Sequence, residues 1–312
     1  MIAIVGATGL VGRKIFEGLI DCGFTNLVLF ASNKSNGKIL EYQGKKYTVY
    51  TLCESNIEIA RPKYAIFSAG KDISKAWAKA FNKIGCIVID NSSCFRKSKK
   101  VPLVAYGINT SIVHNHKGII ANPNCSTLGI LPILDDLKPY GLKRVIITTM
   151  QSVSGAGKKG LDHLKSDIPY FDQPIKDNII AQIGHLNKSG YCEEENKLIN
   201  ESKKILNLKK LNITCTTTRV PVSFCHSISL NVELSKYLSK TKLLNILAKD
   251  KRIVLQELSS PLKTVGTSKV YVSRVRKDNS CWCGYNFFAV SDNLLRGAAT
   301  NAIEILKEIY EE

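Results

Sequence analysis

Short apolar runs alternate with stretches of helical spacing through the first part of the chain. The apolar runs predict five buried strands, at residues 2–5, 27–30, 64–68, 86–90 and 118–122. Apolar positions recur at helical spacing in three of the stretches that follow strands, at residues 11–21, 73–84 and about 126–138. Because strands and helices alternate, this part predicts a parallel sheet built from βαβ units.

The pattern changes near residue 144. Longer runs with alternating apolar positions predict strands at residues 145–151, 211–222, 226–234, 270–276 and 281–290. A charged helix is expected at 193–206, an irregular stretch from 152 to about 190, and a final helix at 294–310. Long alternating strands are typical of an antiparallel sheet with one face covered.

These patterns predict an α/β protein with two domains, which suits a length of 312 residues. The first is expected to be a Rossmann-type dinucleotide-binding domain formed by residues 1–124 and 291–312. The second, residues 125–290, is expected to be an α+β domain with a mainly antiparallel sheet.

The composition is that of an ordinary globular protein, with 44% hydrophobic and 22% charged residues. No apolar stretch approaches the roughly 18 residues of a membrane span, and no basic segment precedes the first apolar run, so we expect no signal peptide and a cytoplasmic protein. The net charge of +18 raises nucleic acid as a partner. Lysine is scattered, however, and its clusters lack interleaved aromatic residues. We therefore expect an anionic small-molecule ligand, and neither nucleic acid nor membrane.

Ten cysteines are present, but none shows Cys-x-x-Cys spacing. With no secretory signal expected, the thiols should remain reduced. Cys281 with Cys283, and His114 with His116, lack the further partners that a zinc site needs. We expect no metal.

A glycine-rich loop lies between the first strand and the first helix, with Gly6, Gly9 and Gly12 in the string Gly-Ala-Thr-Gly-Leu-Val-Gly. Glycines at such a turn let the backbone approach a pyrophosphate, which then lies at the helix N-terminus. The second strand is followed by Ser32, Lys34 and Ser35, without the acidic residue that usually binds the ribose of NAD. This favours NADP over NAD, the alternative being a surface turn whose lysine faces solvent.

Cys125 is the candidate nucleophile. It follows the polar approach Asn122-Pro-Asn124 and precedes a helical run, and a helix N-terminus stabilises a thiolate. Most cysteines are buried apolar residues, but a polar approach at the carboxyl edge of a predicted strand favours a ligand site. His226, at the start of a predicted strand, is the candidate acid–base group; a structural histidine is the alternative.

At this point the sequence resembles the aspartate-semialdehyde dehydrogenase family over essentially its whole length. The matching strings are Gly-Ala-Thr-Gly-Leu-Val-Gly (6–12), Asp-Asn-Ser-Ser-Cys-Phe-Arg (90–96), Asn-Pro-Asn-Cys-Ser-Thr (122–127), Gln-Ser-Val-Ser-Gly-Ala-Gly (151–157), Glu-Glu-Asn-Lys (194–197), Arg-Val-Pro-Val with His-Ser (219–227) and Asp-Asn-Leu-Leu-Arg-Gly-Ala-Ala (292–299). The string around Cys125 is the most specific of the seven.

The resemblance implies NADPH-dependent reduction of L-4-aspartyl phosphate to L-aspartate 4-semialdehyde with release of phosphate, a step toward lysine or diaminopimelate, threonine and methionine. Cys125 would form a thioester, His226 would move the proton, and Gln151 would orient the acyl group. Arg219 would bind the α-carboxylate and Glu194 the α-ammonium. Lys197, Arg96 and Asn124 would hold phosphate.

The resemblance also implies the cofactor contacts and the assembly. The expected NADP(H)-binding residues are Gly6, Thr8, Gly9, Leu10, Val11, Gly12, Ser32, Lys34, Ser35, Ser68, Ala69, Gly70, Ser154, Gly155 and Asn293. Related enzymes are dimers or tetramers built on the sheet of the second domain, so we expect a homodimer or tetramer. The sequence departs from the family pattern in three places: Lys34 replaces a common arginine, Cys225 replaces a glycine or alanine, and Ala-Tyr-Gly-Ile at 105–108 replaces a common Pro-Glu-Val stretch.

Three alternatives remain open at this stage. A sister enzyme would run the same chemistry on another acyl phosphate or aldehyde. A nucleotide-sensing regulator would bind NADP through the glycine loop and nucleic acid through its positive charge, but would need neither Cys125 nor His226. A basic binding protein with a vestigial dinucleotide site is disfavoured by the intact glycine loop.

Overall fold

A computed structural model describes residues 1–166 and 170–310, which form two compact units. The first contains Met1–Asn124 and the segment that begins at Ala298, and the second contains Cys125–Gly297. The return to the first unit was expected at residue 291 and comes instead at Ala298. The reason is that residues after Ser291 are held inside the second unit: Asp292 accepts the N–H of Gly266, and Asn293 accepts that of Cys225.

The first unit is built on a seven-stranded sheet in the order β3-β4-β2-β1-β5-β6-β7. Its strands are β1 (Ile2–Val5), β2 (Leu27–Ala31), β3 (Ile39–Tyr42), β4 (Lys45–Thr51), β5 (Tyr64–Phe67), β6 (Ile87–Asp90) and β7 (Ile119–Ala121). All neighbours pair in parallel except β3 and β4, a hairpin that the apolar pattern did not predict. The predicted parallel sheet is confirmed.

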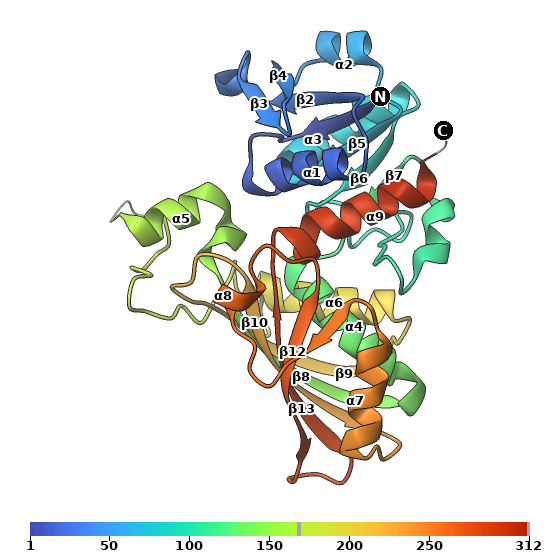
Figure 1. Cartoon of the computed structure of the whole chain (residues 1–312), viewed down its shortest axis with the longest axis vertical. Helices are drawn as coiled ribbons and strands as arrows, with labels where there is room; N and C mark the ends of the chain where they lie inside the picture. The colour runs from blue at the N-terminus through green and yellow to red at the C-terminus, as the bar shows by residue number, and fades with distance from the viewer. Residues whose placement is uncertain (167–169, 311–312) are drawn as a thin grey trace. The chain divides into compact units, whose positions relative to one another are not determined.

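Helices cover both faces of this sheet because its central strands are apolar on both sides. Ile4 and Leu29 pack with α1 (Leu10–Asp21) and α9 (Thr300–Ile309). Val5 and Phe30 pack with α2 (Glu54–Ala60) and α3 (Lys71–Lys83). The short helices η1 (Asn33–Ser35) and η2 (Thr110–Asn115) complete the unit. β1 lies between β2 and β5, so the chain continues to opposite sides of β1 (Figure 1). Ligands of such folds bind at this point, where the strand order reverses.

The second unit is built on a six-stranded sheet in the order β11-β12-β13-β10-β8-β9. Its strands are β8 (Leu142–Gln151), β9 (Asn212–Arg219), β10 (His226–Leu234), β11 (Ile253–Leu255), β12 (Val270–Asp278) and β13 (Gly284–Ser291). The three central pairings are antiparallel, but β8 with β9 and β11 with β12 are parallel, so the sheet is mixed at its edges. The strand expected from residue 281 begins at Gly284, because Asp278 accepts the N–H of Ser280 and forms a turn.

Three helices, α4 (Cys125–Leu137), α6 (Glu193–Ile205) and α7 (Lys240–Lys249), pack against the sheet of the second unit. Val145, Ile147 and Thr149 of β8 are buried, whereas the alternate residue Thr148 is exposed. The stretch expected to be irregular contains η4 (Val153–Ala156) and α5 (Gly157–Lys165). The remaining short elements are η3 (Lys138–Tyr140), α8 (Pro261–Thr264) and the π-helix η5 (Leu295–Ala299). None of the helices described here is long and apolar enough to span a membrane.

Candidate active site

Three predicted site residues form one row across the sheet of the second unit. Gln151, the last residue of β8, pairs with Arg219, the last residue of β9, and with His226, the first residue of β10. Directly paired residues project to the same side of a sheet. All three side chains are buried. The strand register therefore assembles these three side chains at one edge, although they are far apart in the sequence.

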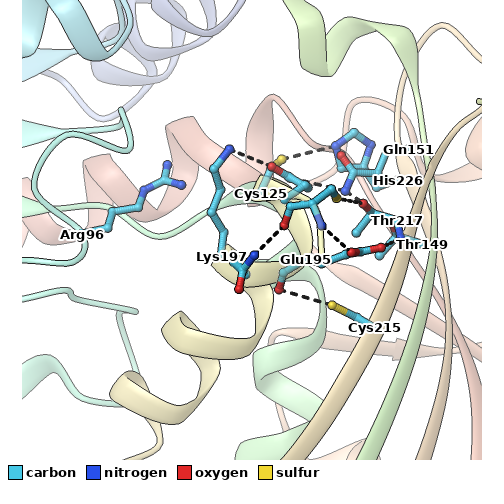
Figure 2. A network of polar contacts seen from close by, with 12 residues as sticks. Arg96, Cys125, Thr149, Gln151, Glu195, Lys197, Cys215, Thr217 and His226 are labelled. Atoms are coloured by element: carbon cyan, nitrogen blue, oxygen red, sulfur yellow. Dashed lines mark hydrogen bonds and ion pairs between the residues drawn. The ribbon is translucent and has the colours of Figure 1, made fainter. Parts of the chain in front are cut away.

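Cys125 begins α4, as the sequence predicts. Its Sγ lies 3.2 Å from Nε2 of His226 (Figure 2). Gly297 packs against Cys125 so closely that a Cβ atom added to Gly297 would lie 2.7 Å from the Cβ of Cys125. Cys125, the candidate nucleophile, lies at a helix N-terminus, where backbone N–H groups and the helix dipole stabilise negative charge on sulfur.

The His226 ring is completely buried, and its two nitrogens face different groups. Nδ1 accepts the backbone N–H of Ser152 at 3.1 Å. A neutral imidazole whose Nδ1 is an acceptor carries its hydrogen on Nε2. Burial, together with the nearby Arg219 cation, lowers the pKa of His226 to about 3. At neutral pH the ring is therefore uncharged and presents an Nε2–H to the sulfur.

The start of α6 contributes a charged pair to the site. Glu194 is buried, and its carboxylate accepts from Lys197 Nζ at 2.9 Å and from Gln151 Nε2 at 3.3 Å. Its neighbour Glu195 anchors the helix to the sheet. The Glu195 carboxylate accepts the N–H of Cys192 at 2.7 Å and that of Thr217 at 3.1 Å (Figure 2).

Arg219 is a buried cation with part of its guanidinium still available. Nη1 donates to the carbonyl of Ser152 at 2.7 Å, whereas Nε has no hydrogen-bond partner in the described part of the chain. The centre of the Phe171 ring lies 5.9 Å from the guanidinium carbon of Arg219. Burial lowers the pKa of Arg219. A buried, partly unsatisfied guanidinium fits a planar anion such as a carboxylate, which accepts two parallel hydrogen bonds.

The glycine loop of the first unit has the geometry that a dinucleotide needs. Gly6 has a φ of +87°, and a Cβ on it would lie 2.9 Å from the backbone of Ser68; a Cβ on Gly12 would lie 2.0 Å from the Gly6 carbonyl oxygen. Thr8, Gly9, Leu10 and Val11 lead from β1 into α1, whose first turn holds no acidic residue. Ser68, Ala69 and Gly70 follow the adjacent β5. The backbone therefore fits a pyrophosphate at the N-terminus of α1.

Ser32, Lys34 and Ser35 directly follow β2, in and beside η1. No carboxylate occurs within this turn, and the Lys34 side chain is exposed. The donor set fits a ribose phosphate. Within residues 1–166 and 170–310, no group of three His, Cys, Asp or Glu side chains is arranged to hold a metal ion.

Comparison with known proteins identifies the family. Residues 1–116 match the family model described as semialdehyde dehydrogenase, NAD binding domain, and residues 130–296 match that of the dimerisation domain. The chain is 38% identical to the aspartate-semialdehyde dehydrogenase of Aquifex aeolicus, with 100% of this chain and 98% of that protein covered. The chain belongs to the aspartate-semialdehyde dehydrogenase family.

Other members of the family agree in sequence and in fold. The Bacillus subtilis enzyme is 36% identical, with 99% of this chain and 96% of that protein covered. The structure of aspartate semialdehyde dehydrogenase II from Vibrio cholerae, complexed with ASA, superimposes with a TM-score of 0.93 at 34% identity and covers 99% of this chain and 97% of its own.

In this family member, six of the predicted catalytic and substrate residues meet in the second unit: Cys125, Gln151, Glu194, Lys197, Arg219 and His226. Arg96 and Asn124 belong to the first unit. There Arg96 donates from Nε to the Asn122 carbonyl at 2.8 Å and from Nη2 to that of Asn91 at 2.6 Å.

Three predicted cofactor contacts lie in the second unit near His226. Ser154 and Asn293 are buried and hydrogen-bonded to each other at 3.1 Å, whereas Gly155 is exposed. A Cβ on Gly155 would lie 2.8 Å from Arg219 Nη1 and 3.3 Å from His226 Cε1. Gly155 therefore leaves space open directly beside His226, the candidate acid–base group.

Sequence reasoning missed three residues that hold the predicted site residues in place but are not themselves among the predicted contacts to substrate or cofactor. Ser152 orients the His226 ring, Glu195 anchors α6, and Gly297 makes room for Cys125. Only Glu195 had a local signal, because an acidic residue three positions after a helix N-cap is the pattern of a capping box. The other two depend on contacts between distant segments.

Proposed function

We propose that the protein catalyses the NADPH-dependent reductive dephosphorylation of L-4-aspartyl phosphate to L-aspartate 4-semialdehyde and phosphate. It would act at the entry to lysine or diaminopimelate, threonine and methionine synthesis. The observation that carries the proposal is the 3.2 Å contact between Cys125 Sγ and Nε2 of a buried, uncharged His226, in one row with Gln151 and Arg219. The names of the relatives support the substrate class.

The nucleophile acts first. The Cys125 thiolate attacks the acyl carbon of aspartyl phosphate, the bond from that carbon to the phosphate oxygen breaks, and a thioester remains on Sγ. Bound NADPH would supply the hydride that reduces the thioester. As the acid–base group, the uncharged His226 would share its Nε2 proton with the hemithioacetal oxyanion through a hydrogen bond, and would keep that proton as the carbon–oxygen double bond re-forms and the carbon–sulfur bond breaks. The aldehyde leaves and the thiolate is restored.

The charged groups of the substrate match the charged side chains around Cys125 and His226. Arg219 would bind the α-carboxylate through its available edge, and the buried Glu194 would bind the α-ammonium. Gln151 would hold the acyl oxygen. Lys197, with Arg96 and Asn124, would hold the phosphate.

The cofactor would be NADP(H), with no metal. The glycine loop with Ser68, Ala69 and Gly70 would hold the pyrophosphate, and Lys34 with Ser32 and Ser35 would hold the ribose phosphate. Ser154, Gly155 and Asn293 would contact the nicotinamide end. The protein would be a homodimer, because residues 130–296 match a dimerisation domain and Thr148, Thr216 and Ser229 are exposed along the second sheet.

The test is phosphate-dependent reduction of NADP by L-aspartate 4-semialdehyde, measured on wild type, Cys125→Ala and the exposed-cysteine control Cys22→Ala. Wild type and Cys22→Ala should turn over, and Cys125→Ala should not. Lys34→Ala should raise the KM for NADP and leave that for NAD unchanged. Activity on a homologous semialdehyde alone would favour the sister enzyme, and NADP binding without turnover would favour the sensor.

A further inference from the structure

The side chain of Asn293 connects the two chain segments that flank His226. Its Oδ1 accepts the N–H of Cys225 at 2.9 Å, and its Nδ2 donates to Ser154 Oγ at 3.1 Å. Cys225 directly precedes His226 and has a left-handed backbone, with a φ of +69°. Asn293 is buried, so these hydrogen bonds are shielded from water. The amide therefore fixes both the residue before His226 and the loop after β8.

Two hydroxyl groups extend this contact to the imidazole. Ser154 Oγ lies 3.0 Å from Ser152 Oγ, and Ser152 Oγ lies 3.2 Å from Nδ1 of His226. Each hydroxyl has one hydrogen to donate. One polarity is consistent throughout: Asn293 donates to Ser154, Ser154 to Ser152, and Ser152 to Nδ1. Each of these side chains then donates one hydrogen bond toward the ring, and both hydroxyls also accept one.

The opposite polarity has a cost at the ring. Both hydroxyls lie 3.2 Å from Asn293 Oδ1, so the Ser152 hydrogen can be directed to that oxygen instead. The Ser152 oxygen would then turn a lone pair toward the unprotonated Nδ1. The Cys225 N–H takes one of the two lone pairs of Oδ1, so at most one of the hydroxyls can also donate there. Since donation of the Ser152 hydrogen to Nδ1 avoids two facing lone pairs, and Asn293 Nδ2 faces Ser154, the geometry favours donation toward the ring.

We propose that Asn293 is a positioning residue that, through a relay by way of Ser154, holds Ser152 so that its hydroxyl joins its backbone N–H in donating to His226, keeping Nδ1 an acceptor and the imidazole proton on Nε2. That proton then faces Cys125 Sγ at 3.2 Å. This role is distinct from the cofactor contact proposed for Asn293. It rests on the proposed function only in taking His226 as the acid–base group.

The direct test is the ¹⁵N NMR spectrum of protein labelled at its histidines, recorded without substrate or cofactor. There are five histidines, and a His226→Gln sample assigns the His226 signals. Wild type should show a protonated Nε2 and an unprotonated Nδ1. In Asn293→Ala the His226 signals should move toward the average of two tautomers. Alkylation of Cys125 by iodoacetamide should slow about fivefold, because the Nε2–H facing the sulfur is less well held.

Asn231→Ala is the matched control. Asn231 also lies on β10, and its amide donates to Asp278 at 2.7 Å and to Asn286 at 2.9 Å. The control should lose stability while keeping the wild-type His226 signals and alkylation rate. Unchanged signals and alkylation in Asn293→Ala, or equal changes in Asn231→Ala, would overturn the proposal.

A second variant covers the case in which Asn293→Ala does not fold. Ser154→Ala removes the next link of the relay but keeps the bond between Asn293 and Cys225. Its His226 signals should also move toward the average, and a wild-type spectrum would overturn the relay. Since neither readout uses the substrate, the relay and the dehydrogenase reaction can fail independently.

Discussion

Gly155 lies against His226 so closely that a Cβ at this position would come within 3.3 Å of the ring carbon Cε1. The same methyl group would lie 2.8 Å from Nη1 of Arg219, nearer than two such atoms can approach. Gly155 has no left-handed backbone to explain the glycine. Its role is therefore spatial, since it keeps the space beside the His226 ring free.

Gly155→Ala should fold normally and lose activity. The added methyl group displaces the Arg219 guanidinium and narrows the approach to His226, so kcat/KM should fall roughly 10²-fold. Gly18→Ala is the control, because its Cβ meets only the flexible end of Ile303 and lies in α1. Steady-state kinetics and thermal melts would check both variants. Full activity in Gly155→Ala would show that the space is not used.

The buried His226 should make the protein less stable in acid. Its pKa is about 3 in the folded protein, against about 6.5 in an unfolded chain. Between these values the unfolded state holds a proton that the folded state lacks, so stability is complete above pH 6.5 and falls as the pH drops. From pH 7 to pH 5, wild type should lose about 2 kcal/mol more than His226→Gln. Urea unfolding at both pH values measures this, and equal losses would contradict it.

Glu195 should matter for stability and for the position of α6. A glutamine at this position offers one acceptor oxygen, whereas the carboxylate serves the N–H groups of both Cys192 and Thr217. Glu195→Gln should therefore destabilise the protein by about 1–3 kcal/mol and raise the KM for the semialdehyde through the displaced Glu194. The exposed Glu193→Gln should stay within about 0.5 kcal/mol of wild type. Equal urea midpoints for the two variants would refute this role.

Cys225 should tolerate glycine better than alanine. Its φ of +69° is costly for a residue with a Cβ and free for glycine. Cys225→Gly should therefore be about 1 kcal/mol more stable than Cys225→Ala, even though glycine is the smaller and more flexible residue. The two urea midpoints decide it, and a more stable alanine variant would mean that the left-handed turn carries no strain.

Much of the fold follows from local patterns. The apolar runs predicted β1, β2 and β5 to within a residue, because strands buried on both faces consist of continuous apolar residues that are easily recognised. The helix α5 was missed, since Gly157 and Gly160 give its sequence low helix propensity. The parallel pairing of β9 with β8 was also missed, because it depends on where a returning chain adds to the sheet.

The site was less accessible to sequence reasoning. Cys125 could be chosen from its polar approach and its helix, but the roles of Gln151 and Arg219 came from family resemblance. Their meeting with His226 is a matter of strand register, which no local pattern encodes. The bond from Ser152 to Nδ1 likewise joins residues that only the folded sheet brings together.

The central claim is that Cys125 carries the acyl group, and mass spectrometry of the enzyme tests it most directly. Protein incubated with L-aspartate 4-semialdehyde and NADP, without phosphate, should form one NADPH per active site and gain the mass of an aspartyl group on the peptide that contains Cys125. Added phosphate should remove that mass, and Cys125→Ala should show neither the burst nor the adduct. A burst of NADPH with no adduct on Cys125 would contradict the account.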